Sequence, residues 1–319
     1  MLAAFAASTS SDDPLSALEV GDVPPPAARD GWTTVHVVAA ALNHHDLWSL
    51  RGVGLPPDRL PMVLGCDAAG RTDDGREVIV HAVVGGAGAP AGQAVAPDEP
   101  RSLLSERYPG TLAEHVSVPI ANLVDKPAGL AWDHAACLPT AYLTAYRALF
   151  RTGRAQPGQR VLVQGAGGGF ATAVVQLGSA AGLDVTVTSG NADKRDRARA
   201  LGAAAAVETG ARIPRVDLVL ESVGAATWAH TMRSVKPGGT VVVVGATTGD
   251  PAPMEVSRLF FQEITVAGAT MGSRDELAQL AAFVTRSGIE PPVDSSYALA
   301  DARRAFQRLA SGAHFGKVV

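Results

Sequence analysis

The chain of 319 residues is 47% hydrophobic and 18% charged, so it is long enough for about two domains with substantial cores and is not mainly disordered. Its formal net charge of −4 lacks the basic excess that binds phosphate backbones, so nucleic acid is not an expected partner. The two cysteines, Cys66 and Cys137, are too few for a disulfide framework or a four-thiolate zinc site. The first eleven residues carry no basic leader and no apolar run approaches about 18 residues, so we expect a cytoplasmic protein that has no membrane partner.

The first 140 residues predict a strand-rich, irregular domain. They hold most of the 21 prolines, together with short β-branched runs at 33–38 and 77–81 that are separated by turn residues. A Gly/Ala/Pro stretch at 85–92 predicts a mobile surface loop.

From about Pro157 the pattern becomes strand, turn, apolar-periodic helix and strand, which is typical of a parallel sheet with crossover helices. We expect helices at 171–181 and 193–201. The expected strands are Arg160–Gln164, Asp184–Thr188, Ala204–Glu208, Val216–Glu221, Thr240–Gly245 and Ile264–Gly268. The fold class is therefore α/β, with a doubly wound parallel sheet.

After Met271 we expect an amphipathic helix at 275–287, a short strand near Tyr297–Leu299 and a second helix at 300–311. This tail is too short to form a core alone. It should therefore pack onto the N-terminal part of the chain.

The turn after the first of these strands is rich in glycine. Its sequence runs Gly165-Ala166-Gly167-Gly168-Gly169-Phe170 and leads into a helix, with Ala171 at the position where a third glycine is usual. Such a turn lets backbone N–H groups approach a pyrophosphate at a helix N-terminus. We predict that Gly165, Gly168, Gly169 and Phe170 bind a dinucleotide, the alternative being a flexible glycine loop.

The end of the next strand favours NADPH over NADH. Ser189 stands where a carboxylate would accept hydrogen bonds from the ribose 2′-hydroxyl, and the basic pair Lys194 and Arg195 follows within reach of a 2′-phosphate. The alternative is that these two are ordinary exposed helix residues. Two further strand ends should contribute backbone groups to the same cofactor, at Val223 and at Gly245, Ala246 and Thr247.

Seven motifs follow one another in a recognisable order. They are Asn43-His44-His45-Asp46, Leu64-Gly65-Cys66-Asp67-Ala68-Ala69-Gly70, Thr111-Leu112-Ala113-Glu114, Leu138-Pro139-Thr140-Ala141-Tyr142, the glycine turn, Val235-Lys236-Pro237-Gly238-Gly239 and Gly316-Lys317-Val318-Val319. Together they resemble the medium-chain dehydrogenase/reductase superfamily, and within it the zinc-independent quinone oxidoreductase branch. The resemblance implies a GroES-like catalytic domain built from residues 1–140 and 271–319, and an inserted Rossmann domain of residues 141–270 that binds NADP.

The resemblance also implies that no metal is bound. The positions that hold catalytic zinc in related alcohol dehydrogenases are occupied by Asn43, Cys66 and Thr140, and two of these are not ordinary zinc ligands. His44 and His45 are adjacent on a segment expected to be extended, so they should point to opposite sides.

We name Asn43, Asp46 and Thr140 as the catalytic candidates. Asn43 could donate to substrate or cofactor, or instead fix its own loop. Asp46 is expected to organise the site rather than to donate a proton. Thr140 is expected to open the helix that leads into the nucleotide domain, capping it, contacting the nicotinamide ribose, or both.

Without zinc to polarise a carbonyl group, the expected reaction is reduction of a quinone or enone by NADPH. The alternatives are a zinc-type alcohol dehydrogenase with atypical ligands and a non-catalytic NADPH-binding sensor. The apolar segment 264–270 predicts a homodimer that pairs through the last Rossmann strand.

Overall fold

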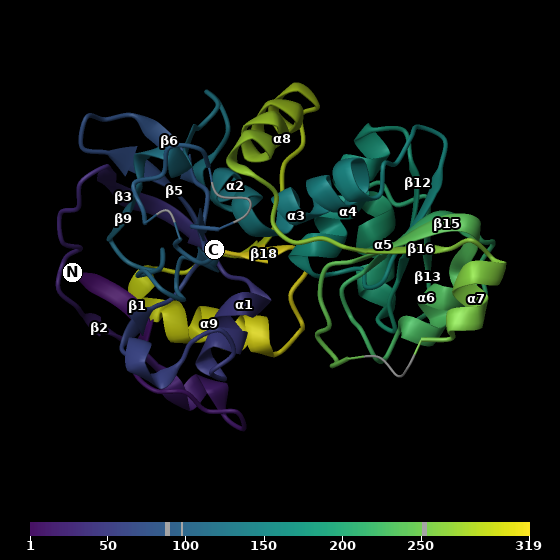
Figure 1. Ribbon diagram of the computed structural model, residues 1–319, viewed down its shortest axis with the longest axis horizontal. Helices are drawn as coiled ribbons and strands as arrows, with labels where there is room; N and C mark the ends of the chain where they lie inside the picture. Colours follow the sequence, from purple (N-terminus) through teal and green to yellow (C-terminus); the bar gives the residue numbers. More distant parts are fainter. Residues whose placement is uncertain (87–89, 97, 251–253) are drawn as a thin grey trace. The chain divides into compact units, whose positions relative to one another are not determined.

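A computed structural model describes residues 1–86, 90–96, 98–250 and 254–319. The centre of the expected loop at 85–92 therefore lies outside the described residues. The chain divides into two units (Figure 1): Met1–Ala141 with Gly272–Val319, called here the catalytic unit, and Tyr142–Met271, the nucleotide unit.

The catalytic unit is built on an antiparallel five-stranded sheet with the order β10-β6-β5-β3-β9. Its strands are β3 (Trp32–Ala41), β5 (Asp67–Thr72), β6 (Glu77–Val80), β9 (His115–Pro119) and β10 (Leu123–Asp125). A second sheet, β2-β1-β4, pairs β1 (Leu2–Ala6) with β2 (Leu18–Asp22) and β4 (Met62–Val63), and β7 (Val83–Val84) pairs with β8 (Ser102–Leu103).

The two ends of the chain share one core in this unit. Leu18, Leu50 and Leu64 from the first part are buried together with Phe306 and Val318 from the last, so the C-terminal segment completes a core that it could not form alone. The remaining elements are α1 (His44–Leu50), α2 (Trp132–Ala136), α8 (Arg274–Arg286), α9 (Ala302–Ala310), β17 (Val293–Ser295), β18 (Lys317–Val318) and 3-10 turns at Pro14–Ala17, Pro57–Arg59, Ile120–Asn122 and Leu299–Asp301.

Two expectations for this unit were wrong. Tyr297–Leu299 forms no strand; the strand is β17, whose partner is the C-terminal β18. Tyr297 and Leu299 pack against the shared core although their segment is not a strand. Apolar residues at every second position are also the pattern of a half-buried strand, which is why the sequence suggested one here. His44 and His45 lie on α1 rather than on an extended segment.

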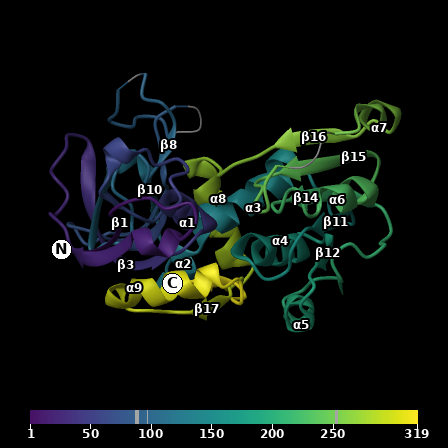
Figure 2. The ribbon, with the colours of Figure 1, turned by 90° about the horizontal axis from the view of Figure 1, so that it is seen from below.

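The nucleotide unit holds a parallel six-stranded sheet with the order β13-β12-β11-β14-β15-β16 (Figure 2). Its strands are β11 (Arg160–Val163), β12 (Asp184–Thr188), β13 (Ala205–Val207), β14 (Val216–Glu221), β15 (Val235–Val243) and β16 (Thr265–Gly268). Its helices are α3 (Leu143–Tyr146), α4 (Gly169–Ala180), α5 (Ala192–Ala200), α6 (Trp228–Ser234) and α7 (Val256–Phe261), with π-type turns at Leu138–Tyr142, which ends on the first residue of this unit, and Arg147–Thr152.

The central strands of this sheet are buried, in agreement with their continuous apolar sequences. Val161, Leu162 and Val163 are fully buried, as expected of a parallel strand covered on both faces. The predicted α/β class with a doubly wound parallel sheet is confirmed. No helix in the described part of the chain is long and apolar enough to span a bilayer.

Candidate functional site

Four neighbouring strands of the nucleotide unit end along one edge of the sheet. The order β12-β11-β14-β15 is continuous and every pairing is parallel, so the residues that follow these strands lie side by side. They are Ser189 after β12, Gly165 after β11, Val223 after β14, and Gly245, Ala246 and Thr247 after β15. The structure therefore brings together the cofactor candidates that follow the strands along what we call the nucleotide edge.

The glycine turn connects β11 to α4. Gly165 has φ +95°, a conformation that glycine adopts without steric strain. Gly168 is the N-cap residue of α4, and Gly169 and Phe170 form its first turn. The unpaired N–H groups of this first turn are suited to bind a phosphate.

Lys194 lies against this turn. It is on α5, whose start is capped by Asn191, because the Asn191 Oδ1 accepts a hydrogen bond from Lys194 N. A methyl group placed on Gly167 would lie 2.7 Å from Cδ and 3.1 Å from Nζ of Lys194. An ammonium group thus stands beside the backbone that would receive the cofactor phosphates.

Arg195 is engaged differently. Its Nη1 donates to the backbone oxygen of Ser189 at 2.7 Å, and its Nη2 lies 3.6 Å from the carboxylate of Glu208. The Ser189 hydroxyl accepts from Asn191 N at 3.1 Å. Arg195 therefore holds the β12–α5 loop in place, whereas Lys194 is the basic side chain that reaches the glycine turn.

A network of buried hydrogen bonds joins the strand ends of the nucleotide edge to one another and to α6. Gln164 Oε1 accepts from the Thr188 hydroxyl at 2.9 Å, and Gln164 Nε2 donates to the Thr231 hydroxyl at 2.9 Å. The carboxylate of Glu221 accepts from Thr231 and from the backbone N–H groups of Val223 and Gly224. Strand ends that are tied in this way present their backbone groups in one fixed arrangement.

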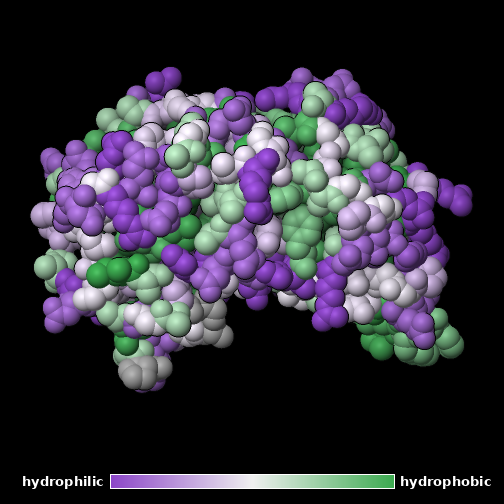
Figure 3. All heavy atoms as spheres, turned by 90° about the horizontal axis from the view of Figure 1, so that it is seen from above, coloured by the Kyte–Doolittle hydropathy of each residue, from purple (hydrophilic) through white to green (hydrophobic). Residues whose placement is uncertain are grey.

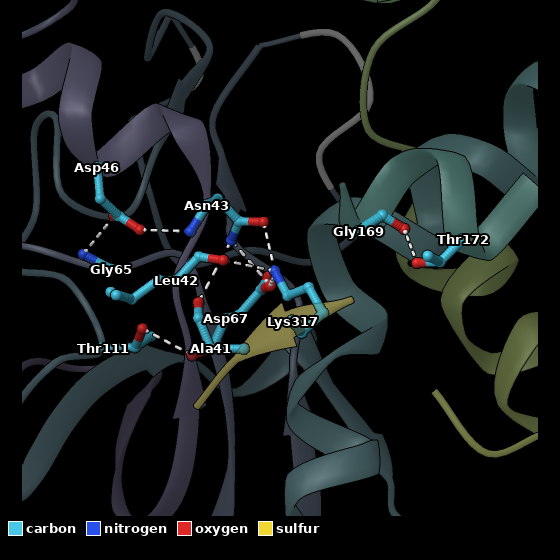
Figure 4. Close-up of polar contacts among 10 residues, drawn as sticks. All are labelled: Ala41, Leu42, Asn43, Asp46, Gly65, Asp67, Thr111, Gly169, Thr172 and Lys317. Atoms are coloured by element: carbon cyan, nitrogen blue, oxygen red, sulfur yellow. Dashed lines mark hydrogen bonds and ion pairs between the residues drawn. The ribbon is translucent and has the colours of Figure 1, made fainter. Parts of the chain in front are cut away.

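The catalytic unit contains a second buried polar cluster, formed by Asn43, Asp67 and Lys317 (Figure 4). The Lys317 ammonium donates to Asn43 Oδ1 at 2.6 Å, to Leu42 O at 2.7 Å and to Asp67 Oδ2 at 3.1 Å. Asn43 Nδ2 donates to the same Asp67 oxygen at 2.8 Å. The carboxamide of Asn43 is thus held by partners within its own unit.

Asp46 organises the backbone next to this cluster. Its two oxygens accept from Asn43 N at 2.8 Å and from Gly65 N at 3.1 Å, so it joins the start of α1 to the segment before Cys66. Burial raises the pKa of Asp46 to about 6. Because both oxygens are occupied by backbone donors, this carboxyl positions the loop.

Cys66 is fully buried, and burial raises the pKa of its thiol well above the ordinary value, with the Asp46 charge acting in the same direction. Its Sγ donates to Leu104 O at 3.2 Å. Thr140 lies inside the π-type turn at Leu138–Tyr142, within a helical run that begins at Trp132. The expectation that Thr140 opens a helix was wrong, because the helical conformation starts two turns earlier.

These residues do not fit a catalytic zinc ion. Zinc requires a thiolate, an imidazole or a carboxylate from each of three protein ligands, whereas Asn43 is a carboxamide already bound to Lys317 and Thr140 offers a hydroxyl. Within the described ranges, no group of three His, Cys, Asp or Glu side chains lies close enough together to hold a metal ion.

Two residues of these sites are not among the candidates that the sequence indicates. Gly167 is part of the glycine turn, and its missing side chain makes room for Lys194. Lys317 belongs to the terminal motif 316–319, and its burial with Asp67 is seen only in the structure. A signal existed for it, because a lysine between a glycine and two valines in a short strand is placed for burial, and a buried lysine requires an anionic partner.

Comparison with known proteins gives two family models and many relatives. Residues 29–128 match the alcohol dehydrogenase GroES-like domain, and residues 191–319 match the zinc-binding dehydrogenase family. A zinc-type alcohol dehydrogenase-like protein of Leptosphaeria maculans is 27% identical, over 95% of this chain and 94% of its own length. A crotonyl-CoA carboxylase/reductase of Cereibacter sphaeroides is 24% identical, over 95% of this chain and 83% of its own length. A solved structure of a putative alcohol dehydrogenase from Sinorhizobium meliloti is 30% identical, covers 99% of this chain and 97% of its own, and superposes with a TM-score of 0.86.

Proposed function

This chain belongs to the medium-chain dehydrogenase/reductase superfamily of oxidoreductases, and we propose that it reduces a quinone or an α,β-unsaturated carbonyl compound with NADPH and without a metal ion. The proposal places it in the zinc-independent quinone oxidoreductase-like branch. It also names Asn43, Asp46 and Thr140 as residues of the catalytic unit that shape the reaction, Asn43 and Asp46 as positioning residues.

The observation that carries the proposal is the state of Asn43. Its carboxamide is bound by Lys317 and Asp67, so the position that is a zinc ligand in related alcohol dehydrogenases is here part of a buried polar cluster. Without a Lewis acid, oxidation of a simple alcohol lacks the charge that stabilises an alkoxide. A conjugated acceptor needs less electrostatic stabilisation from the protein, because it spreads the incoming negative charge over several atoms.

Three features of the nucleotide edge support NADPH as the cofactor. Ser189, at the end of β12, offers no carboxylate that would repel a 2′-phosphate. Lys194 stands against Gly167 and would supply a positive charge beside the phosphates. Arg195 keeps the loop that carries Ser189 in place.

NADPH, when bound, would transfer a hydride to the acceptor carbon, and solvent would supply the one proton that balances the reduction. The residues of the nucleotide edge bind and orient the dinucleotide through backbone N–H groups, and the cluster around Asn43 and Asp46 keeps the catalytic loop in one conformation. Positioning is then the main contribution of the protein to the rate.

One relative favours this reaction and another favours the alternative. The crotonyl-CoA carboxylase/reductase is named for an α,β-unsaturated thioester, which is a conjugated acceptor. The Leptosphaeria protein is named as zinc-type, which keeps a zinc-type alcohol dehydrogenase with atypical ligands as the second candidate.

The test follows NADPH absorbance with a panel of quinones, enones and enoyl thioesters, using protein purified without chelator. We expect NADPH consumption with at least one conjugated acceptor, at a rate that EDTA does not change. Oxidation of an alcohol that is lost in EDTA and restored by zinc would establish the second candidate. Cofactor binding without turnover on any member of the panel would indicate a sensor.

We also propose that the protein is a homodimer with two-fold symmetry through β16. Among the described strands, β15 alone pairs with β16, and an exposed edge of this kind pairs readily with another strand. The neighbouring helix α7 exposes Val256, Phe260 and Phe261, at 65%, 62% and 80% of their surfaces, and apolar residues gather on the surface at this end of the unit (Figure 3).

Light scattering on two variants tests the dimer. Val266→Pro removes a backbone donor from β16, and Thr265→Lys places like charges near the two-fold axis while changing only an exposed residue. We expect a dimeric wild type and at least one monomeric variant that keeps the wild-type circular dichroism. A monomeric wild type, or two folded variants that both stay dimeric, would exclude pairing through β16.

A further inference from the structure

A second cavity of the nucleotide unit is strongly basic. It has a volume of about 870 Å³, and the charged side chains that line it are Arg212, Arg215, Arg233 and Arg258, with no carboxylate among the lining residues. We propose that this basic pocket binds a small anion that carries two or more phosphate groups, at a site separate from the nucleotide edge.

The basic pocket lies at the opposite edge of the sheet from the cofactor residues. Arg215 immediately precedes β14, and Arg233 and Ser234 immediately precede β15, whereas Val223 and Gly245 come after these two strands. A strand of six residues such as β14 is roughly 20 Å long at about 3.3 Å per residue. An anion in the basic pocket therefore cannot share the phosphate contacts of the glycine turn.

The four guanidinium groups have no anionic partner within the described part of the chain. No ion pair or side-chain hydrogen bond joins any of them to another described residue, and the Nε of Arg258 is buried without a hydrogen-bond partner. The carboxylates that flank Arg212 and Arg215 in sequence are already engaged, since Asp217 pairs with Lys236 and Glu208 with Arg195. Four like charges around one hollow repel one another, and a bound polyanion would relieve that repulsion.

His230 forms part of the pocket wall and is hydrogen-bonded at both ring nitrogens. Its Nε2 lies 2.9 Å from Ala211 O, and its Nδ1 lies 2.9 Å from Gln164 Nε2. The Ser234 hydroxyl donates to His230 O at 2.8 Å. The polar groups of His230 and Ser234 are therefore used within the protein, and the four arginines supply the positive charge of the pocket. The planar guanidinium group is the side chain best matched to a phosphate.

The shape favours a small anion over an acidic protein surface. A volume of 870 Å³ lies within the range of about 300–1,000 Å³ that is usual for small-molecule sites. The buried Nε of Arg258 can be reached by a phosphate that enters the hollow, whereas the carboxylates of a flat protein surface would meet only the three exposed arginines.

Isothermal titration calorimetry with inorganic pyrophosphate tests the site on the full chain at physiological salt. The variants are Arg215→Ala/Arg233→Ala, which removes two exposed arginines of the pocket, and Arg286→Ala/Arg304→Ala, which removes two exposed arginines of the catalytic unit. We expect saturable binding to wild type, a loss of affinity of about tenfold or more in the first variant, and a change of less than about twofold in the control.

Lys194→Ala separates the basic pocket from the glycine turn, because pyrophosphate is also a candidate for the turn. We expect saturable binding to persist in Lys194→Ala and to be weakened there by the Arg215→Ala/Arg233→Ala pair. The proposal fails if pyrophosphate does not saturate, if only Lys194→Ala weakens it, or if the control pair weakens it equally. Tighter binding of a hexaglutamate peptide than of pyrophosphate would instead identify the pocket as a docking surface for an acidic protein.

Discussion

The two units prepare their sites in opposite ways. In the catalytic unit, Lys317 and Asn43 both donate or accept hydrogen bonds within a buried cluster with Asp67, in which Asp67 Oδ2 is the acceptor and Asp67 Oδ1 has no partner among the described residues. At the nucleotide edge, glycines and backbone N–H groups are left available, and a basic side chain stands beside them. The first arrangement stabilises a loop; the second is built to receive a ligand.

This difference predicts that substitutions in the two regions affect different properties of the protein. Substitutions in the buried cluster should lower the free energy of unfolding, because they leave a buried charge without its partner and without solvation. Changes at the nucleotide edge should lower cofactor affinity and leave stability nearly unchanged.

Lys317→Met should destabilise the protein by about 3–5 kcal/mol, because it leaves the carboxylate of Asp67 buried with Asn43 as its only hydrogen-bond donor. Urea unfolding followed by circular dichroism measures the change. The matched control is Lys236→Met, since the Lys236 side chain is 44% exposed in its pair with Asp217 and should cost at most about 1 kcal/mol. Equal losses in the two variants would show that the buried cluster has no special role in stability.

Asp46→Asn should change how stability depends on pH. Burial raises the Asp46 pKa from 3.8 to about 6 in the folded protein, so the folded state binds the proton more tightly than the unfolded state. The stabilisation that the protonated form provides is complete below about pH 4 and is lost as the pH rises through 6.

The substitution should therefore be more destabilising at pH 4 than at pH 7, by about 2 kcal/mol. Chemical unfolding of both proteins at the two pH values gives this difference directly. A difference of the opposite sign would mean that the two backbone donors, Asn43 N and Gly65 N, hold Asp46 as a carboxylate in spite of its burial.

Lys194→Ala should weaken NADPH by about 1–3 kcal/mol, the range of a charge-assisted hydrogen bond, and weaken NADH less, because NADH has the same pyrophosphate but lacks the 2′-phosphate. Arg195→Ala is the matched comparison. It removes the contacts to Ser189 O and Glu208, so it should affect both cofactors alike by loosening the loop. Fluorescence titration with both cofactors separates the two residues, and tighter binding of NADH by wild type would overturn the choice of NADPH.

Much of the fold could be predicted because local patterns and topology agree. Strands β12 and β14 have the predicted bounds, 184–188 and 216–221, since each is a short apolar run between turn residues. Helix α1 was missed for an identifiable reason. Asn43 and Asp46 form a capping box at its start, a signal of a helix N-terminus that was read only as chemistry.

The site residues also fall into two groups, those that the sequence could place and those that it could not. Residues that follow parallel strands could be placed from the sequence, because strand direction alone puts them at one edge. The approach of Lys194 to Gly167 depends on the rotation of α5 about its own axis, and the pairing of Lys317 with Asp67 depends on a strand that returns from a position 250 residues later in the chain. Neither is encoded in a local pattern.

Gly167→Ala should have the smallest effect and gives the sharpest test of the nucleotide edge. The new methyl group would lie 2.7 Å from Cδ of Lys194, so this flexible side chain must move away from the turn, while the backbone at Gly167 does not have a positive φ and tolerates alanine. We expect NADPH to weaken by about 1 kcal/mol, less than in Lys194→Ala because the charge is displaced and not removed. Stability should match that of Gly21→Ala, a control on β2 in which the atom nearest to the added methyl group is Phe5 Cε1 at 4.0 Å. If Gly167→Ala weakens NADH as much as NADPH, the methyl group obstructs the dinucleotide itself, and the discrimination between cofactors does not come from the position of Lys194.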